Sequence, residues 1–291
     1  MLSNGGRRIP NLFIIGAMKS GTTSLHHYLA YHPQAFMCEP KEPGYFVEEL
    51  NLRLGLDWYL DLFQNANGAR IIGESSTHYA KLPAYQGVCE RIHAFNPDAR
   101  FVYLMRDPLQ RIVSHYWHNV RNLFLEAERR DFATAVAEDP TYLAFSDYAG
   151  QLEPYFRLFG RDRVYCMVYE EMVADPAGTT RALLDWLGLE DEIPPSVFTE
   201  RWNARPAAIR QARGLGLLNR LAHSGLWSRL SPLVPKSIRR YASSLASRDV
   251  KVEKEVTDGM LAQLRPRVRV QVDTLQVLLG REFPQWSTAA T

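Results

Sequence analysis

The sequence predicts an α/β fold in which helices cover both faces of a central parallel sheet. Short, nearly continuous apolar runs alternate with helical patterns, and this alternation is typical of strands buried on both faces. The chain has 291 residues, 46% of them hydrophobic and 23% charged, which suffices for a sizeable core and excludes a disordered or fibrous protein. A single domain over residues 1–291 is expected, with its α/β body at about 8–190.

Strands and helices follow one another along the body. The buried-strand pattern covers residues 11–17, 69–75, 100–106 and 163–169. Helices are predicted over residues 22–31, 55–63, 84–95, 108–124 and 176–187, with another at 253–279 near the end. Pro108 opens one of these helices at a position where its missing N–H costs nothing. After about residue 190 the strand pattern stops, which predicts a helical C-terminal appendage at about 200–291.

The net charge of +2 conceals a strong asymmetry. The stretch from Asn203 to Arg248 holds nine basic residues and no acid, so the rest of the chain carries a net charge of −7. Such a segment predicts an anionic partner or a membrane surface, although a solvated basic helical surface is the plain alternative. Repulsion among these charges also predicts a mobile cover that closes over bound ligands. No nucleic-acid-binding motif accompanies the charge, so no nucleic-acid partner is expected.

The three cysteines, Cys38, Cys89 and Cys166, form neither a Cys-x-x-Cys pair nor a zinc-type pattern. They are expected to be reduced core thiols, and no metal site is expected. The early apolar run IPNLFIIGAM is too short to span a bilayer, and no small-residue cleavage site follows it. These patterns predict a cytoplasmic protein, with peripheral membrane contact through the basic segment as an open alternative.

The first predicted strand runs into GAMKSGTTSLHHYL, a glycine-bearing turn that opens a helix. Unpaired N–H groups and the positive end of the helix dipole make such a turn an anion site. Gly16, Gly21 and Thr23 match the P-loop pattern G-x-x-x-x-G-K-S/T. Thr22 occupies its lysine position, however, and Lys19 lies three residues earlier. An ATPase needs that lysine on the β- and γ-phosphates, so the loop suits phosphate binding without ATP hydrolysis.

The KSGTT segment resembles the 5′-phosphosulfate loop of sulfotransferases that use 3′-phosphoadenosine 5′-phosphosulfate (PAPS). The segment YLMRDPLQRIVSHYWH resembles the 3′-phosphate motif of the same family, in which Arg106 ends a strand and Ser114 follows on a helix. Arginine can bind phosphate oxygens bidentately, and a serine hydroxyl can donate to a third oxygen. The resemblance covers residues 11 to about 190 and implies a P-loop-type three-layer sandwich. The nucleotide-binding residues that these two motifs imply are Lys19, Ser20, Gly21, Thr22, Thr23, Arg106 and Ser114.

Two further segments resemble the Golgi-type and heparan-sulfate branch of that family. In CEPKEPGYFVEELNLRLGLDWYLDLF, Glu42 precedes an aromatic pair and matches the general base of that branch, with Lys41 beside it to keep it ionised. The alternative for Glu42 is a cap on a helix that starts near Gly44. In GESSTHYAKLP, Ser75 stands where many heparan-sulfate relatives have a lysine, which puts an acceptor with the same anionic spacing in doubt. His78 is the second candidate base, with a structural hydrogen bond as its alternative role.

Two late segments complete the implied site. VYEEMVADP resembles a stretch whose tyrosine lies against the adenine, which gives that role to Tyr169, and a core-facing tyrosine is the alternative. RQARGLG would supply, through Arg213 and Gly214, the basic loop that closes over the nucleotide in this family.

The resemblance implies in-line transfer of the sulfuryl group of PAPS to a hydroxyl or amine of an acceptor, with 3′,5′-adenosine diphosphate as the product and no metal. The catalytic residues implied are Lys19 and Glu42, with His78 as the alternative base. A carbohydrate or glycolipid acceptor is favoured, and a small hydroxylated molecule is a further alternative. A kinase and a non-catalytic scaffold are the two alternative functions. A P-loop kinase for a small metabolite requires a lysine at position 22, and a non-catalytic nucleotide-binding scaffold predicts a damaged loop or a lost base.

Overall fold

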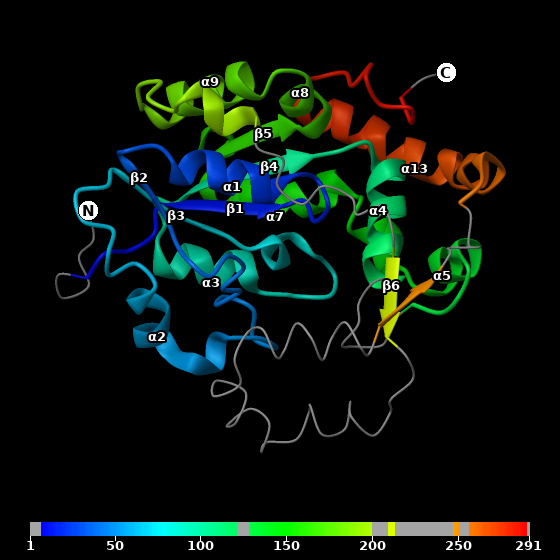
Figure 1. The fold of residues 1–291 in the computed structure, drawn as a ribbon, viewed down its shortest axis with the longest axis horizontal. Coiled ribbons are helices and arrows are strands. Elements are labelled where there is room, and N and C mark those ends of the chain that lie inside the picture. Colours follow the sequence, from blue (N-terminus) through cyan, green and yellow to red (C-terminus); the bar gives the residue numbers. More distant parts are fainter. Residues whose placement is uncertain (1–6, 121–127, 200–208, 213–246, 251–255, 290–291) are drawn as a thin grey trace.

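The computed structural model describes residues 7–120, 128–199, 209–212, 247–250 and 256–289. Its centre is a sheet of five parallel strands in the order β2-β3-β1-β4-β5 (Figure 1). The strands are β1 (Leu12–Gly16), β2 (Ala35–Met37), β3 (Ile71–Ser75), β4 (Arg100–Met105) and β5 (Val164–Val168). The four predicted strands are confirmed, each trimmed by a residue or two at its ends. Strand β2 was not predicted, because its three residues carry too short a pattern.

The helices of the described chain surround this sheet (Figure 1). The α-helices are α1 (Thr22–Ala30), α2 (Gly55–Asp61), α3 (Val88–Phe95), α4 (Pro108–Val120), α5 (Phe132–Glu138), α6 (Thr141–Ala144), α7 (Tyr148–Phe159), α8 (Tyr169–Ala174), α9 (Pro176–Leu187) and α13 (Asp258–Leu279). The 3-10 helices are η1 (Leu52–Leu54), η2 (Thr77–Ala80), η3 (Arg161–Arg163) and η4 (Pro195–Thr199). The predicted helix at 108–124 is present as far as Val120, where the described stretch ends.

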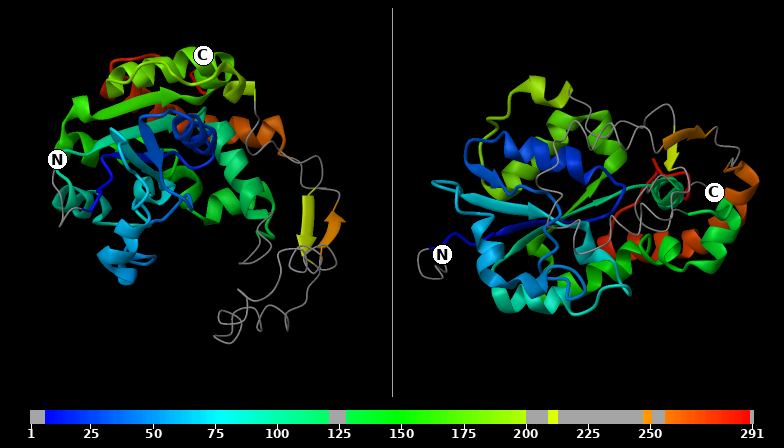
Figure 2. Two further views of the ribbon diagram at one scale, coloured as in Figure 1. Left: turned by 60° about the vertical axis from the view of Figure 1, so that its left-hand side comes forward. Right: turned by 60° about the horizontal axis from the view of Figure 1, so that its bottom comes forward.

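Alternation along β1 assigns side chains to the two faces of the sheet. Leu12 and Ile14 join an apolar cluster with α1, α8 and α9 on one face. Phe13 and Ile15 join a larger cluster with α3, α4, α7 and α13 on the other. Both helical layers are visible in the two further views of Figure 2. The three-layer architecture expected from the sequence is therefore confirmed.

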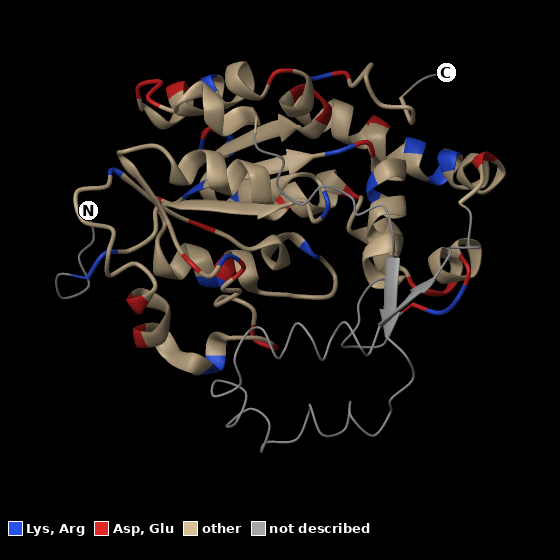
Figure 3. Ribbon diagram, in the orientation of Figure 1, with Lys and Arg blue, Asp and Glu red and all other residues tan. Residues whose placement is uncertain are grey.

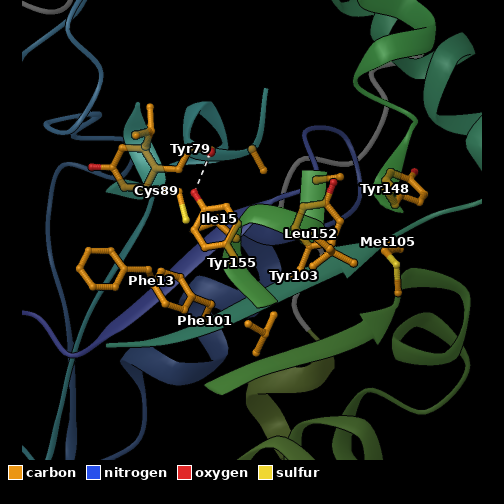
Figure 4. Packing of buried hydrophobic residues seen from close by; sticks show 14 of the residues in the cluster. Phe13, Ile15, Tyr79, Cys89, Phe101, Tyr103, Met105, Tyr148, Leu152 and Tyr155 are labelled. Atoms are coloured by element: carbon orange, nitrogen blue, oxygen red, sulfur yellow. Dashed lines mark hydrogen bonds between the residues drawn. The ribbon is translucent and has the colours of Figure 1, made fainter. Parts of the chain in front are cut away.

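The larger cluster contains many aromatic rings. Figure 4 shows Phe13, Phe101 and Tyr103 of the sheet beside Tyr155 of α7. The Phe13 and Phe101 rings stack with centroids 5.6 Å apart, and the Tyr155 hydroxyl donates to the carbonyl oxygen of Tyr79 at 2.8 Å. This bond joins α7 to the segment just after β3, where the candidate site begins.

The end of the chain packs into the body. Val268, Val272 and Leu275 of α13 are buried in the larger cluster. Beyond the helix, the Trp286 indole donates to the Glu170 carboxylate at 2.9 Å, next to the end of β5. The C-terminal helix is therefore part of the fold's core, while a single domain over 1–291 remains a prediction.

One prediction about the second part of the chain is wrong. Strands do not stop near residue 190, because β6 (Ile209–Ala212) and β7 (Ser247–Val250) form an antiparallel pair. The two partners are separated by more than thirty residues, and a local pattern of four residues cannot reveal such a pairing.

Most of the basic segment between Asn203 and Arg248 lies outside the described residues, as do Arg213 and Gly214. The mobile cover and the closing loop therefore remain predictions. In the described body, acidic and basic residues are interspersed over both helical layers (Figure 3). No helix in the described ranges is long and apolar enough to cross a membrane. Cys38, Cys89 and Cys166 are all free thiols, two of them buried, as expected.

Candidate functional site

The loop between β1 and α1 is shaped to receive an anion. Gly21 adopts a left-handed backbone (φ 92°) at the start of α1, and no side chain caps this helix. The first N–H groups of α1 therefore remain available to a negatively charged ligand. Ser20 is fully buried, and its hydroxyl oxygen has no hydrogen-bond partner in the described part of the chain. The predicted phosphate loop thus combines open backbone donors with an unused hydroxyl.

Both glycines of the loop are required by close packing. A Cβ atom on Gly16 would lie 2.3 Å from the Tyr103 ring of β4. A Cβ atom on Gly21 would lie 2.8 Å from the Tyr169 ring and 2.9 Å from the Met172 methyl group, both on α8. The loop therefore lies directly against the carboxyl ends of β4 and β5, where ligands of open parallel sheets bind.

Replacing Gly21 with alanine tests this packing. Gly21→Ala is expected to lower the free energy of unfolding by about 2–4 kcal/mol, from the left-handed backbone together with the overlap on Tyr169 and Met172. Gly68→Ala is the matched control, since Gly68 has a similar φ of 76° and open space around it. The control should cost about 1 kcal/mol. Urea unfolding measures both, and equal losses would show that the loop is not tightly packed.

Arg106 joins the loop from the end of β4. Its Nη1 donates to the carbonyl oxygen of Lys19 at 3.4 Å, and its guanidinium lies 4.9 Å from the Tyr169 ring centre. The Tyr148 hydroxyl fixes the backbone here by donating to the carbonyl oxygen of Arg106 at 2.7 Å. The structure therefore brings three of the predicted residues together from three elements. Contact of Tyr169 with an adenine remains a prediction.

Ser114 lies half-buried on α4, about two turns after the helix begins. Asp107 caps that helix, because its carboxylate accepts the Leu109 N–H at 2.9 Å. The other oxygen of Asp107 accepts the backbone N–H of Ser287 at 2.6 Å, which fastens the C-terminal segment to the motif. The role of Ser114 at a 3′-phosphate remains a prediction.

Glu42 and His78 form a pair. The Glu42 N–H donates to the carbonyl oxygen of Ser75 at 2.9 Å, and the carboxylate accepts the Thr77 N–H at 2.7 Å. His78 Nδ1 lies 3.4 Å from the same carboxylate oxygen, and Lys41 forms an ion pair with the other. Glu42 does not cap a helix that starts near Gly44, because the chain forms turns there. Its carboxylate instead caps η2 by accepting the Thr77 N–H. The two candidate bases therefore lie side by side.

These contacts determine the charge of Glu42. Burial acts to raise its pKa, but hydrogen bonding to His78 and the charge and hydrogen bond of Lys41 outweigh it and lower the pKa to about 2. The carboxylate is therefore ionised throughout the physiological range, as a proton acceptor must be.

Backbone strain marks the same two residues that the sequence singles out for catalysis. In the described ranges, Lys19 (φ 72°) and Glu42 (φ 65°) are the non-glycine residues with a left-handed backbone. Such conformations typically cost about 1–3 kcal/mol and cluster at functional sites. No signal in the sequence reveals this strain.

Glu74 is a candidate site residue that no pattern in the sequence predicts. It is fully buried at the end of β3, and its carboxylate accepts hydrogen bonds from the hydroxyls of Tyr59, Tyr79 (2.9 Å) and Ser76 (2.7 Å). The Ser76 hydroxyl in turn accepts the N–H of Gly44 at 2.9 Å. Glu74 therefore links the sheet, through Ser76, to the loop that carries Glu42.

The pH dependence of folding tests the state of Glu74. Burial raises its pKa to about 7, from an ordinary value of 4.5, despite the three hydroxyl donors. The folded protein therefore holds a proton that the unfolded chain loses between these pH values, so stability falls as pH rises from about 4.5 to about 7. Wild-type stability is expected to fall by up to about 3 kcal/mol relative to Glu74→Gln over this range. A pH-independent difference in urea unfolding would contradict this account.

The structure is an α/β fold of the P-loop type, with an uncapped helix start after β1 that suits an anion. A family model described as "Sulfotransferase family" matches residues 55–193, a range that contains Arg106, Ser114 and Tyr169. Over this range, just under half of the chain, the sequence is similar to the sulfotransferase family. The fold is that of the sulfotransferase from Alicyclobacillus acidocaldarius, with a TM-score of 0.67 and 24% identity over 96% of this chain and 99% of that one.

Curated relatives confirm the resemblance to the heparan-sulfate branch. The heparan sulfate glucosamine 3-O-sulfotransferase 3A1 of Mus musculus is 28% identical over 225 residues, which are 74% of this chain and 55% of that protein. Heparan sulfate glucosamine 3-O-sulfotransferase 6 of Mus musculus is 28% identical over 244 residues, covering 80% of this chain and 68% of that protein. The chain spans about half the length of the first of these relatives.

Proposed function

We propose that this protein transfers the sulfuryl group of PAPS to a hydroxyl or amine of a carbohydrate acceptor. The observation that carries the proposal is that two sets of groups lie at the carboxyl ends of neighbouring strands, since β1 pairs with both β3 and β4. Lys19, Arg106 and Tyr169 converge on the loop after β1. Glu42 and His78 form a pair at the end of β3, where Glu42 binds the Ser75 carbonyl. An anion site and an ionised carboxylate at the same edge of the sheet suit transfer from a phosphate-bearing donor to an acceptor group that must lose a proton.

The residues of the loop fit such a donor. The open N–H groups of α1, the unpartnered Ser20 hydroxyl and the close approach allowed by Gly21 suit the 5′-phosphate. Arg106 and Ser114 are the residues for the 3′-phosphate, which distinguishes PAPS from ATP. Bound PAPS supplies an activated sulfuryl group on a good leaving group. In the described part of the chain, no cluster of three metal-ligating side chains occurs.

Glu42 takes the proton of the acceptor. In the ligand-free protein its pKa of about 2 makes it a weak base, because Thr77, Lys41 and His78 all stabilise its charge. An acceptor hydroxyl that displaces one of these groups removes part of that stabilisation and raises the pKa toward a useful value. Lys19 stabilises negative charge that grows on the leaving phosphate. The protein thereby contributes orientation and charge stabilisation.

The nature of the acceptor is inferred from the relatives. Two proteins of the heparan sulfate branch match most of this chain, which favours a carbohydrate over a small phenol or lipid. The kinase alternative is disfavoured by Thr22 at the position of the essential lysine.

Radiolabelled PAPS tests the proposed function. A desulfated heparan-type polysaccharide, a glycolipid and a simple phenol are incubated separately with the protein and the labelled donor. We expect label to enter a carbohydrate acceptor and to remain near background with Lys19→Ala. Label in the phenol alone would contradict the carbohydrate acceptor. Label transferred instead from γ-labelled ATP and magnesium would favour the kinase.

A further inference from the structure

Three buried nitrogen-bearing side chains converge on the segment that follows α6, and the proposed mechanism uses none of them. The Lys81 ammonium lies 5.8 Å from the centre of the Phe145 ring, and the His115 ring stacks on that ring with centroids 5.8 Å apart. Arg111 Nε donates to the Ser146 hydroxyl at 2.5 Å. Lys81 is 9% exposed, His115 is 5% exposed and Arg111 is fully buried. We refer to Lys81, Arg111 and His115 as the Phe145 cluster.

In the described part of the chain, no acid forms an ion pair with this cluster. Within the described ranges, neither Lys81 nor Arg111 has a carboxylate within the 4.0 Å of an ion pair. Arg111 Nη1 and His115 Nδ1 are buried without a hydrogen-bond partner among the described residues. Unpaired buried cations and orphaned donors destabilise a fold unless a ligand compensates them. The cluster therefore has the composition of a binding site for a negatively charged group.

The pKa shifts of Lys81 and His115 are consistent with their burial beside each other. Burial lowers the pKa of Lys81 to about 8, although the Glu42 carboxylate acts in the opposite direction. Burial, and then the charges of Arg111 and Lys81, lower the pKa of His115 to about 2. His115 is therefore neutral at pH 7, while Lys81 and Arg111 both carry charge.

We propose that the Phe145 cluster binds an oxyanion, a sulfate or carboxylate group, held by Lys81 and by Nη1 of Arg111. Lys81 directly follows η2, and η2 carries the His78 that contacts Glu42. The Glu42 carboxylate also acts on the pKa of Lys81, so the proposed anion would lie on the same side of the molecule as the Glu42–His78 pair. One source of the oxyanion is an acidic group on the acceptor itself, an assignment that rests on the proposed function. The other source is free sulfate or phosphate.

A negatively charged acceptor group at this position is consistent with a difference between this sequence and its relatives. Ser75 stands where many heparan-sulfate relatives have a lysine, so this chain lacks that positive charge at the end of β3. Lys81 supplies a positive charge six residues later, after η2. The acceptor that fits this chain therefore carries its acidic group at a different distance from the reacting hydroxyl.

A sulfate titration tests the site. The full chain, saturated with 3′,5′-adenosine diphosphate to occupy the loop of Lys19, is titrated with sodium sulfate at ionic strength held constant by sodium chloride. The melting temperature is expected to rise saturably. Lys81→Met should weaken sulfate binding by about tenfold or more, because a charge-assisted contact is lost. The exposed Arg157→Met variant is the matched control and should behave as the wild type.

The sulfate-free proteins add a second readout. Lys81→Met is expected to melt at the same or a higher temperature than the wild type, since it removes an unpaired buried charge. A lysine with a merely structural role would instead lower the melting temperature when replaced. Arg111→Lys is the second variant, and it keeps the charge but loses the planar donor fork, so sulfate binding should again weaken.

Two methyl glycosides distinguish the sources. Binding of methyl glucuronoside, absent for methyl glucoside and lost in Lys81→Met, would assign the site to an acidic acceptor. Binding of sulfate with neither glycoside would assign it to a free oxyanion. Absence of saturable sulfate binding, or equal binding by the wild type and Lys81→Met, overturns the proposal. The titration requires no turnover, so its outcome is independent of the radiolabel test of sulfuryl transfer.

Discussion

Lys19→Ala is expected to lower sulfuryl transfer by a factor of about 100 or more, while the affinity for 3′,5′-adenosine diphosphate falls only modestly. The lysine lies in the loop after β1, where its carbonyl oxygen accepts a hydrogen bond from Arg106, and in the proposed mechanism its ammonium stabilises charge on the leaving phosphate. Interactions that strengthen in the transition state affect turnover more than ground-state binding. Loss of one such charge-stabilising group typically costs a factor of about 100–1,000 in rate. Steady-state rates with radiolabelled PAPS and calorimetric binding of the product measure the two quantities separately.

Lys19→Arg is the control for this variant. It keeps the positive charge at the same strained backbone position (φ 72°), so it should retain more activity than the alanine variant. Turnover of Lys19→Ala within a few-fold of wild type would show that the lysine is not catalytic. A loss of product affinity as large as the loss of turnover would instead make it a binding residue.

Glu42→Gln is expected to lower turnover by a factor of about 100–10,000, with nucleotide affinity unchanged, because an amide cannot accept the proton of the acceptor. The backbone of the variant can keep its bond to Ser75, and the amide oxygen can still accept the Thr77 N–H. The substitution therefore removes the charge and leaves the loop in place. Rates at saturating acceptor, together with calorimetric nucleotide binding, measure the effect.

His78→Ala should be milder than Glu42→Gln. His78 is one of the groups that lower the pKa of Glu42 to about 2, so its removal raises that pKa toward the ordinary value of 4.5. Glu42 then stays ionised at pH 7 and remains able to act as the base. Because the two side chains contact each other, the double variant should lose little more than Glu42→Gln alone. The reverse ranking of the single variants would assign the base to His78.

The sheet and its helices were largely predictable because buried parallel strands leave continuous apolar runs. The strands over 11–17, 69–75, 100–106 and 163–169 all correspond to observed strands. Helices α5 to α7, between Phe132 and Phe159, were not predicted, because they are short or contain prolines. The β6–β7 pairing depends on residues far apart in sequence, which no local pattern encodes.

The site was predictable where a motif is contiguous. KSGTT and the Arg106 segment have fixed spacings, and the structure places Arg106 against the loop. Glu42 and His78 were identified as alternatives, but only the fold shows that they touch. Glu74 and the Phe145 cluster were not predicted, because their shifted pKa values and unpartnered polar atoms result from burial. The neighbours of a polar residue in the sequence do not show whether it is buried.

The most direct test of the central claim is the calorimetric comparison of three nucleotides on the wild-type chain. We expect one site that binds 3′,5′-adenosine diphosphate. Adenosine 5′-monophosphate should bind at least about tenfold more weakly, because it lacks the 3′-phosphate that Arg106 and Ser114 would bind. ATP with magnesium should bind weakly, since Thr22 replaces the lysine that holds its β- and γ-phosphates. Equal affinities for the di- and monophosphate, or tighter binding of ATP with magnesium, would contradict the assignment of this site to PAPS.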